Sequence, residues 1–428
     1  MEDALIMKRF LSLILCLVFV VCALVSCGDE VVEPIPEHYP EIQDKTIDRT
    51  VDLYMIVGED TPKTVYDSVA RMIYAYVLKT YDIELNVKFE YDNTVKKDES
   101  GNLVSCFNKG ITTLTAGGTK SAILLVNDYE FMDALDSASD DPEVNFKLLD
   151  LSGYLTTTKF GKLNKDLPDA LIDAVTVEKQ EFVLNEKDEK VLDEAGKPVT
   201  KPVNKIFAMP NNRVLGEYEY LVINKAVARD MCLYSPEILK SYVTYEQTAE
   251  LRARMAELGY TQAEIDEYVR PVSGAYSDRF VYEAQGNYCN IVSVPEITRE
   301  DALESAFVAV DTGNDKLNEK AMQIIYALNY DAELRNLLQY GVKNTNYTIE
   351  EREVVDKNGE TVTVEYIKLE GGENTYRMNP YYTGNMFIMA YCEELDEFDA
   401  GELPAIVWTY ETMLSGIEQN KDVVLADD

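Results

Sequence analysis

The order of apolar runs and helical patterns in residues 51–151 constrains the fold more than any other feature of this sequence. Short apolar runs typical of strands occupy 51–57, 83–89, 121–126 and 148–151. Apolar residues at helical spacing fill the interval between the first two runs, and a second helical stretch follows the third. Strands that alternate with helices along a chain build a parallel sheet covered by helices. The sequence therefore predicts an α/β fold with a parallel sheet.

Local start and turn signals predict further elements. Two later helices are expected to begin with capping boxes, Thr244 with Gln247 and Thr261 with Glu264. A third helix is expected to begin near Thr298, and apolar residues at helical spacing form a stripe at 317–328. Two antiparallel hairpins are predicted, one turning at 195–197 and one turning at 356–359. We find no internal repeat in the sequence.

The length of the chain predicts more than one lobe. It has 428 residues, whereas a single core stops growing at about 250–300 residues. We expect the chain to cross between two lobes near 210–217 and again near 304–312. The predicted parts are a leader at 1–26, a proline-rich acidic tether at 27–50, lobe 1 at 51–211 plus about 306–350, and lobe 2 at 212–305 plus about 351–428, with a C-terminal helix.

The first residues read as a secretion signal. Lys8 and Arg9 precede an apolar run at 10–25, which is short for a bilayer span of about 20 residues and typical of a signal peptide. The run ends in Leu-Val-Ser-Cys-Gly at 24–28, which resembles the lipobox of bacterial lipoproteins. That resemblance implies cleavage before Cys27, lipidation of Cys27, and an extracytoplasmic protein anchored to the cell membrane. The alternative is an uncleaved helix with an incidental cysteine.

Composition excludes several classes of function. His38 is the single histidine, which removes Ser-His-Asp and Cys-His catalysis and zinc sites with several histidines. Lys and Arg number 40 against 77 Asp and Glu, a net charge of −37, so nucleic acid is not expected as a partner. The remaining cysteines show no metal-binding spacing, and disulfides or buried thiols are both open to them: Cys106, Cys232, Cys289 and Cys392. No metal and no cofactor are expected.

Five features in order resemble one family, the maltose-binding-protein-like class of extracellular solute-binding proteins of ABC importers. They are the lipobox, strand–helix–strand at 51–90, the apolar strand and helix at 121–136, the stretches IFAMP and EYEYLVINKAVARD within 206–230, and the strand and helix at 306–329. Segments 334–342 and 381–388 are also similar to a lipoprotein branch of that class. The resemblance implies a two-lobed periplasmic-binding-protein-like fold of type II with a hinge. It also implies a carbohydrate ligand, an ABC permease as the membrane partner, a monomer and no enzymatic activity.

Two clusters of polar and aromatic residues are candidates for the ligand site. They are Asn211, Asn212, Arg213, Tyr218 and Tyr220, and Tyr376, Arg377, Tyr381 and Tyr382. Tyrosine offers a flat apolar face to a sugar ring together with a hydroxyl, and amides bond to sugar hydroxyls. Tyr218 and Tyr220 lie one strand period apart, so they are expected to share a face. The alternatives are turn residues that bond to their own backbone at 211–213 and core packing for the tyrosines.

Two other functions remain open from the residues alone. A secreted glycan-acting hydrolase would use a pair of carboxylates, and this acidic chain has many, although no local motif points to a pair. A binding lipoprotein without a transport partner would need the same cleft and no permease. The sequence does not distinguish a sugar from a peptide as the ligand.

Overall fold

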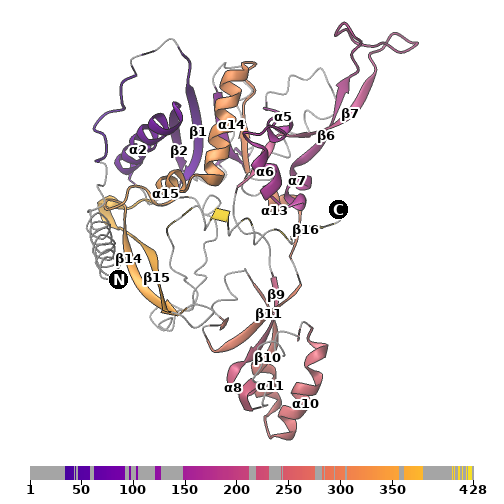
Figure 1. Cartoon of the computed structure of the whole chain (residues 1–428), viewed down its shortest axis with the longest axis vertical. Coiled ribbons are helices and arrows are strands. Elements are labelled where there is room, and N and C mark those ends of the chain that lie inside the picture. Colours follow the sequence, from indigo (N-terminus) through magenta and orange to yellow (C-terminus); the bar gives the residue numbers. More distant parts are fainter. Residues whose placement is uncertain are drawn as a thin grey trace, which may run out of the picture. The chain divides into compact units, whose positions relative to one another are not determined.

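The structure is a computed structural model of the whole chain, which divides into two units, residues 1–35 and residues 36–428. The residues that it describes are 34–42, 44, 47–57, 62–91, 96–97, 103–104, 121–126, 148–211, 218–230, 242, 244–274, 282–283, 285–293, 295–303, 306–355, 361–378, 407, 409, 413–414, 417, 421 and 423–426. Every element below belongs to the second unit, and most are labelled in Figure 1. The combination of helices with a mixed five-stranded sheet confirms the predicted α/β class.

Five strands form the larger sheet. Their order is β2 (Glu84–Tyr91), β1 (Thr50–Val57), β5 (Ser121–Val126), β13 (Ala306–Ala309) and β8 (Ala208–Pro210). Strands β2, β1 and β5 are parallel, as predicted. Strand β13, which lies outside the segment for which a parallel order was predicted, is antiparallel to both of its neighbours. After the second sheet the chain returns to the end of the larger sheet at which it left. Strand β13 begins there, at Ala306 beside Pro210, the last residue of β8, and therefore runs in the opposite direction.

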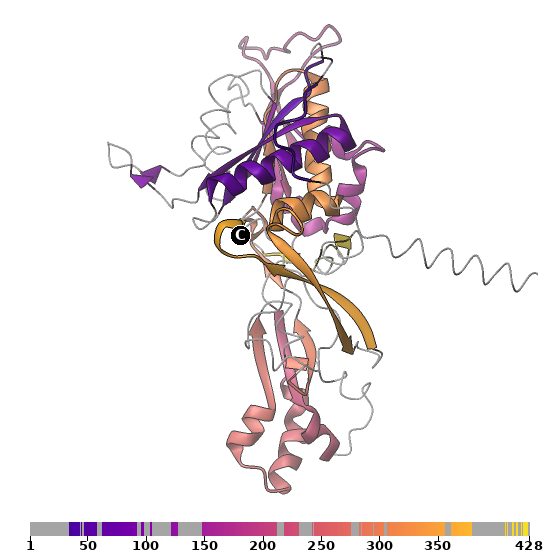
Figure 2. The ribbon, with the colours of Figure 1, turned by 90° about the vertical axis from the view of Figure 1, so that its left-hand side faces the viewer.

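Helices from distant parts of the chain pack on or beside this sheet. Helix α2 (Lys63–Tyr81) packs against β2, helix α14 (Asp315–Tyr330) packs against β1, β5 and β13, and helix α15 (Ala332–Tyr340) contacts both helices. Figure 2 shows α2 lying against the strands. The predicted stripe on α14 is confirmed, because Leu317, Ala321, Ile324, Ile325 and Leu328 are all buried.

A hairpin follows three short helices. Helices α5 (Ser152–Leu155), α6 (Gly161–Asp166) and α7 (Asp169–Val175) lead into the antiparallel strands β6 (Thr176–Phe182) and β7 (Thr200–Ile206). The predicted turn is confirmed: Gly196 has φ +77°, and Asp193 Oδ1 accepts the amides of Ala195 and Lys197. Asn185 makes a second turn of the same kind, with Oδ1 accepting the amides at 187 and 189.

The expectation of no internal repeat is wrong for this hairpin. Val183, Val191 and Val199 are equally spaced in the sequence, and the first two begin the similar segments VLNEKDEK and VLDEAGKP. Their backbones form a closed ring of hydrogen bonds: Val183 N–H donates to Val199, Val199 to Val191, and Val191 to Val183, at 2.8–2.9 Å. Two equivalent turns therefore result from two copies of one short pattern.

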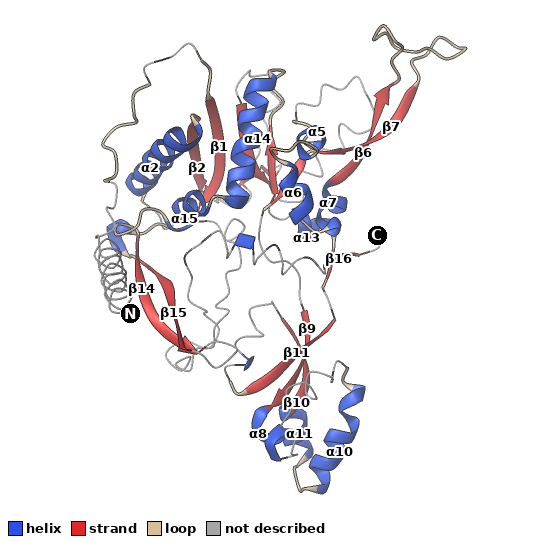
Figure 3. Cartoon of the chain, viewed as in Figure 1, coloured by secondary structure: helices blue, strands red, loops and turns tan. Residues whose placement is uncertain are grey.

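A second sheet has a core of its own. It has the antiparallel order β10 (Val269–Gly274), β9 (Tyr218–Asn224) and β11 (Asn287–Ser293). Helices α8 (Lys225–Asp230), α10 (Ala249–Glu257) and α11 (Gln262–Tyr268) supply apolar side chains to its core, and Figure 3 shows them grouped beside these strands. Both predicted capping boxes are confirmed, at Thr261–Glu264 and at Thr244–Gln247, where a short 3-10 helix (Glu246–Thr248) precedes α10.

The remaining described elements are short or paired only with each other. They are β3 (Lys96–Lys97) with β4 (Leu103–Val104), β12 (Glu296–Ile297) with β16 (Val424–Leu425), helix α13 (Arg299–Leu303), and the ribbon β14 (Tyr347–Val355) and β15 (Thr361–Leu369), followed by a 3-10 turn (Gly372–Asn374). The ribbon confirms the second predicted hairpin, whose turn at 356–359 lies outside the described residues. None of the described helices combines the length and the apolar composition needed to cross a membrane.

The strands of the two sheets come from the segments predicted for lobe 1 and lobe 2, respectively. Residues from the segment predicted for lobe 2 nevertheless pack against elements of the predicted lobe 1: Tyr376 contacts α2 and β2, and Ile367, Val407 and Met413 lie in a cluster with Tyr340 of α15. The lobe boundaries and the hinge stay predictions.

Candidate functional site

Strands β1, β2, β5 and β8 end on the same side of the larger sheet. Val126 of β5 and Pro210 of β8 both pair with Ala306, so the ends of these two strands are level. In open α/β sheets, ligands bind outside the carboxyl ends of the strands. We call this side the carboxyl edge, and its described residues Asn211, Arg335 and Tyr376 define the candidate site.

Asn211 follows β8 directly and is 1% exposed. Its Oδ1 accepts a hydrogen bond from Nη1 of Arg335, on α15, at 2.6 Å. A guanidinium only donates hydrogen bonds, so this contact identifies which atom of the carboxamide is the oxygen. The side chain of Asn211 is therefore fixed by a partner from a distant segment, which neither sequence-based alternative for Asn211 included. Asn212 and Arg213 lie outside the described residues.

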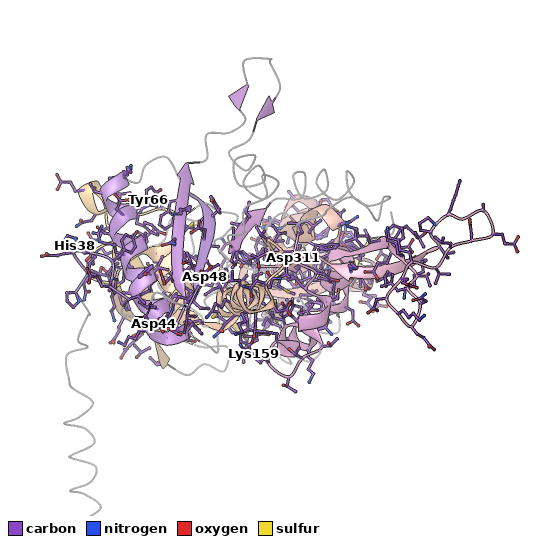
Figure 4. All side chains as sticks on the ribbon, turned by 90° about the horizontal axis from the view of Figure 1, so that it is seen from above. His38, Asp44, Asp48, Tyr66, Lys159 and Asp311 are labelled. Atoms are coloured by element: carbon purple, nitrogen blue, oxygen red, sulfur yellow. The ribbon has the colours of Figure 1, made fainter. Side chains whose placement is uncertain are left out.

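Tyr376 is fully buried near the carboxyl end of β2. Its ring packs edge-on against Tyr66 of α2 and Phe89 of β2, with centroid distances of 5.8 and 6.1 Å; Figure 4 labels Tyr66. Its hydroxyl donates to the carbonyl oxygen of Leu338, in α15, at 2.7 Å. This placement favours the core-packing alternative for Tyr376.

Of the other residues of the second cluster, only Arg377 is among the described residues. Arg377 is half-buried and donates to the Tyr376 carbonyl at 2.8 Å and to the Glu370 carbonyl at 3.4 Å. Those bonds hold the backbone of the segment that carries Tyr376. Tyr381 and Tyr382 lie outside the described residues.

Helix α15 joins the two predicted clusters. Arg335 bonds to Asn211 near its start, and Leu338 accepts from Tyr376 near its end. Every residue from 334 to 340 is buried, including three polar side chains, Arg335, Asn336 and Gln339. A helix buried on all sides is normally apolar, so a polar face within α15 points to recognition or to a polar packing network.

The start of α15 is held by a carboxylate that accepts several hydrogen bonds. Asp331 caps the helix by accepting the Leu334 amide at 3.0 Å, and it accepts the hydroxyl of Tyr76 at 2.9 Å and that of Tyr81. Burial and the negative charge of Asp331 raise the pKa of Tyr76, and burial together with the hydrogen bond to Asp331 raises the pKa of Tyr81. Both tyrosines belong to α2, so α2 and α15 are joined at this point.

Tyr218 and Tyr220 share a face of β9, as predicted. Their rings stack at 6.1 Å with 17° between planes, and both side chains are buried. Their cluster also holds Val222 and Cys289, with Val272, Tyr282 and Ile291 packed against it. The two rings therefore pack the second sheet, and burial of Cys289 favours the buried-thiol alternative for that cysteine.

Sequence reasoning did not select Arg335. The segment LRNLLQYGV was noted only for its resemblance to the lipoprotein branch, yet its three polar residues interrupt an otherwise apolar helix. That interruption was the available signal. Within the described ranges, no group of three or more His, Cys, Asp or Glu side chains could hold a metal ion.

Comparisons with known proteins give distant structural neighbours. No protein-family model and no curated protein matches the chain. Among solved structures, the N-glycan transport solute-binding protein NgtS from Streptococcus pneumoniae has 13% identity over 88% of this chain and 84% of its own, with a TM-score of 0.39. The complex of NgtS with Man5GlcNAc has 14% identity over 88% of this chain and 82% of its own, with a TM-score of 0.37. Maltose-bound MalE3 from T. maritima has 10% identity over 68% of this chain and 80% of its own, with a TM-score of 0.25.

Proposed function

We propose that this chain is an extracytoplasmic solute-binding protein that captures a carbohydrate and delivers it to an ABC permease. The observation that carries the proposal is the junction at α15. Asn211 and Tyr376, one residue from each of the two clusters chosen from the sequence as ligand-site candidates, lie far apart along the chain and both bond to one buried helix at the carboxyl edge. The order of elements that resembles sugar-binding receptors supports the same function.

The chemistry of the described edge suits binding. Its side chains include one amide, two guanidinium groups and one phenol, at Asn211, Arg335, Arg377 and Tyr376. Amides and guanidinium groups bond to sugar hydroxyls, and aromatic rings pack against the apolar faces of pyranose rings. We therefore propose capture of the sugar without chemical change.

The ligand contacts are assigned to the two clusters. We propose that Asn211, Asn212 and Arg213 of the first cluster and Arg377, Tyr381 and Tyr382 of the second contact the sugar. Tyr218, Tyr220 and Tyr376 are not among the proposed contacts, since their rings pack against other side chains.

The leader gives the proposed location. Cleavage before Cys27 and lipidation of its thiol would anchor the protein at the outer face of the cell membrane, with the segment to residue 50 as a tether beside the permease. Cys27→Ser is expected to accumulate as a precursor without lipid when expressed in a bacterium and labelled with a fatty-acid probe. Labelled Cys27→Ser protein would refute the anchor.

A thermal-shift screen tests the function. The panel should hold galactose, maltose, mannotriose and Man5GlcNAc, because the named ligands of the structural neighbours include a glycan and maltose, with a tripeptide mixture for comparison. A sugar at about 100 times its Kd should stabilise the protein by about 2.7 kcal/mol. A shift with peptides alone contradicts the carbohydrate assignment, and release of shorter glycans during incubation favours the hydrolase.

A further inference from the structure

Part of the segment proposed as a tether is bound to helix α2. The carbonyl oxygen of Pro36 accepts a hydrogen bond from Nε of Arg71, in α2, at 2.8 Å. The ring of Tyr39 packs edge-on against Tyr74, about one turn further along the same helix, with the two centroids 5.0 Å apart. The boundary between the two units of the chain also falls directly before Pro36. We call residues 36–49 the strap, because they belong to the folded unit rather than to the first one.

The end of the strap is held at the end of the same helix. Asp82 follows the last residue of α2 and accepts a hydrogen bond from Nη1 of Arg49. The side chain of Arg49 is buried, and its Nη2 donates to the carbonyl oxygen of Asp44, within the strap, at 3.4 Å. Figure 4 labels three residues of the strap, His38, Asp44 and Asp48. A segment that one helix holds at two places adds no length to a spacer between the lipid and the folded protein.

The strap sets how far the folded protein can lie from the proposed anchor. Pro36 is nine residues after Cys27, whereas Thr50, the first residue of β1, is 23 residues after it. An extended chain spans at most about 3.5 Å per residue, so the bound strap limits the reach to about 30 Å. A spacer that continued to Thr50 would reach about 80 Å. With the shorter limit, the attachment point on α2 stays close to the bilayer.

We propose that the strap turns the side of the protein that carries α2 towards the lipid bilayer. Strand β2, on which α2 packs, is the first in the order β2-β1-β5-β13-β8, and the β6–β7 hairpin comes just before β8, the last strand in that order. Neighbouring strands lie about 4.8 Å apart, so β8 is about 19 Å from β2. The hairpin therefore lies on the side away from the bilayer, and only the residues before Pro36 act as the spacer. This inference rests on the lipid anchor of the proposed function and not on the identity of the sugar.

Limited proteolysis of the purified protein tests whether the strap is bound. A protease that cuts after glutamate has Glu37 and Glu41 of the strap as targets, both with exposed side chains. Cleavage requires the backbone around these residues to come free of the helix. Tyr39→Ala combined with Arg71→Ala removes both contacts with the middle of α2, and we call this protein the released variant. The released variant should be cut at the two sites at least tenfold faster than the wild type.

The matched control loses one ring contact and one arginine contact elsewhere. Tyr260→Ala combined with Arg229→Ala removes an edge-on ring pair with Tyr268, at 6.2 Å, and an ion pair with Asp230, at 3.7 Å. The control should be cut in the strap at the wild-type rate. If the released variant fails to fold, Tyr39→Ala alone replaces it, because the Tyr39 side chain is 48% exposed and lies outside the core.

Energy transfer to a bilayer tests which side of the protein faces it. The lipidated protein is placed in phosphatidylcholine vesicles with a fluorescent lipid as acceptor, because a surface without net charge does not repel the acidic strap. The donor is a fluorescent amino acid at Lys63, exposed in α2, or at Glu186, exposed in the hairpin. In the wild type, transfer from position 63 should exceed transfer from position 186 at least twofold. That ratio should approach one in the released variant and stay unchanged in the control.

Three results would overturn the inference. Equal cleavage rates in the wild type and the released variant would mean that α2 does not hold the strap. Equal transfer from the two positions in the lipidated wild type would mean that the strap does not orient the protein. Both results leave the proposed function intact. A wild type that carries no lipid would remove this inference together with the proposed anchor, whereas sugar binding in the thermal-shift screen would still stand.

Discussion

Replacing Tyr376 by phenylalanine separates its packing role from a ligand role. The change keeps the ring between Tyr66 and Phe89 and removes only the hydroxyl, which donates to the Leu338 carbonyl. Leu338 is among the last four residues of α15, whose carbonyls have no partner within the helix. The hydroxyl therefore caps the helix from a distant segment.

The expected cost follows from that geometry. A buried carbonyl left without its donor costs about 1–3 kcal/mol, and we expect Tyr376→Phe to lower the free energy of unfolding by about that amount. Urea unfolding followed by far-ultraviolet circular dichroism measures the loss. Tyr39→Phe is the control, since Tyr39 is 48% exposed and should unfold as the wild type does. Unchanged stability of Tyr376→Phe together with weaker sugar binding would refute the packing role and return Tyr376 to the ligand site.

Three further outcomes are expected. Gly341→Ala should lose about 1–3 kcal/mol in urea, because Gly341 has φ +83° and an added Cβ would lie 2.6 Å from Asn346 Oδ1; wild-type stability would contradict the backbone geometry. The pKa of Tyr76 in the folded protein is raised above its unfolded value of about 10. The contribution of Tyr76 to the free energy of unfolding is therefore complete below pH 10 and is lost as the pH rises above 10. In Tyr76→Phe the free energy of unfolding should fall less steeply above pH 10 than in the wild type. An equal slope in the variant and the wild type would count against the bond to Asp331. Thr261→Ala should cost about 1 kcal/mol by removing the capping box of α11, measured by the same urea titration, and no change would show that the cap is not stabilising.

Local signals were readable from the sequence because they depend on neighbours along the chain. The capping box at Thr261, the turn at Gly196 and the stripe on α14 each need only a few consecutive residues. The strands at 51–57, 83–89 and 121–126 followed for the same reason, whereas the predicted strand at 148–151 is wrong, because that run makes only a single bridge at Leu148 before helix α5. The direction of β13 was not readable, because it depends on the end of the sheet to which the chain returns after the second sheet.

The candidate site was readable only in part. Asn211 and Tyr376 were selected by residue type and position, but their partners come from α15, far away in the sequence. A polar residue in a buried helix reveals that it needs an acceptor, not which residue supplies it. The face shared by Tyr218 and Tyr220 followed from strand period, whereas Val272, Cys289 and Ile291, which pack against it, come from the two neighbouring strands.

Calorimetric titration of the purified wild-type protein with maltose and Man5GlcNAc, followed by mass analysis of the recovered sugar, tests the central claim most directly. The account predicts saturable binding of at least one sugar, near one site per chain, with the sugar recovered unchanged. Asn211→Ala in the same titration should bind it more weakly. No heat of binding with either sugar or with the rest of the panel, or recovery of shortened glycans, would contradict the assignment of this chain as a carbohydrate-capturing receptor.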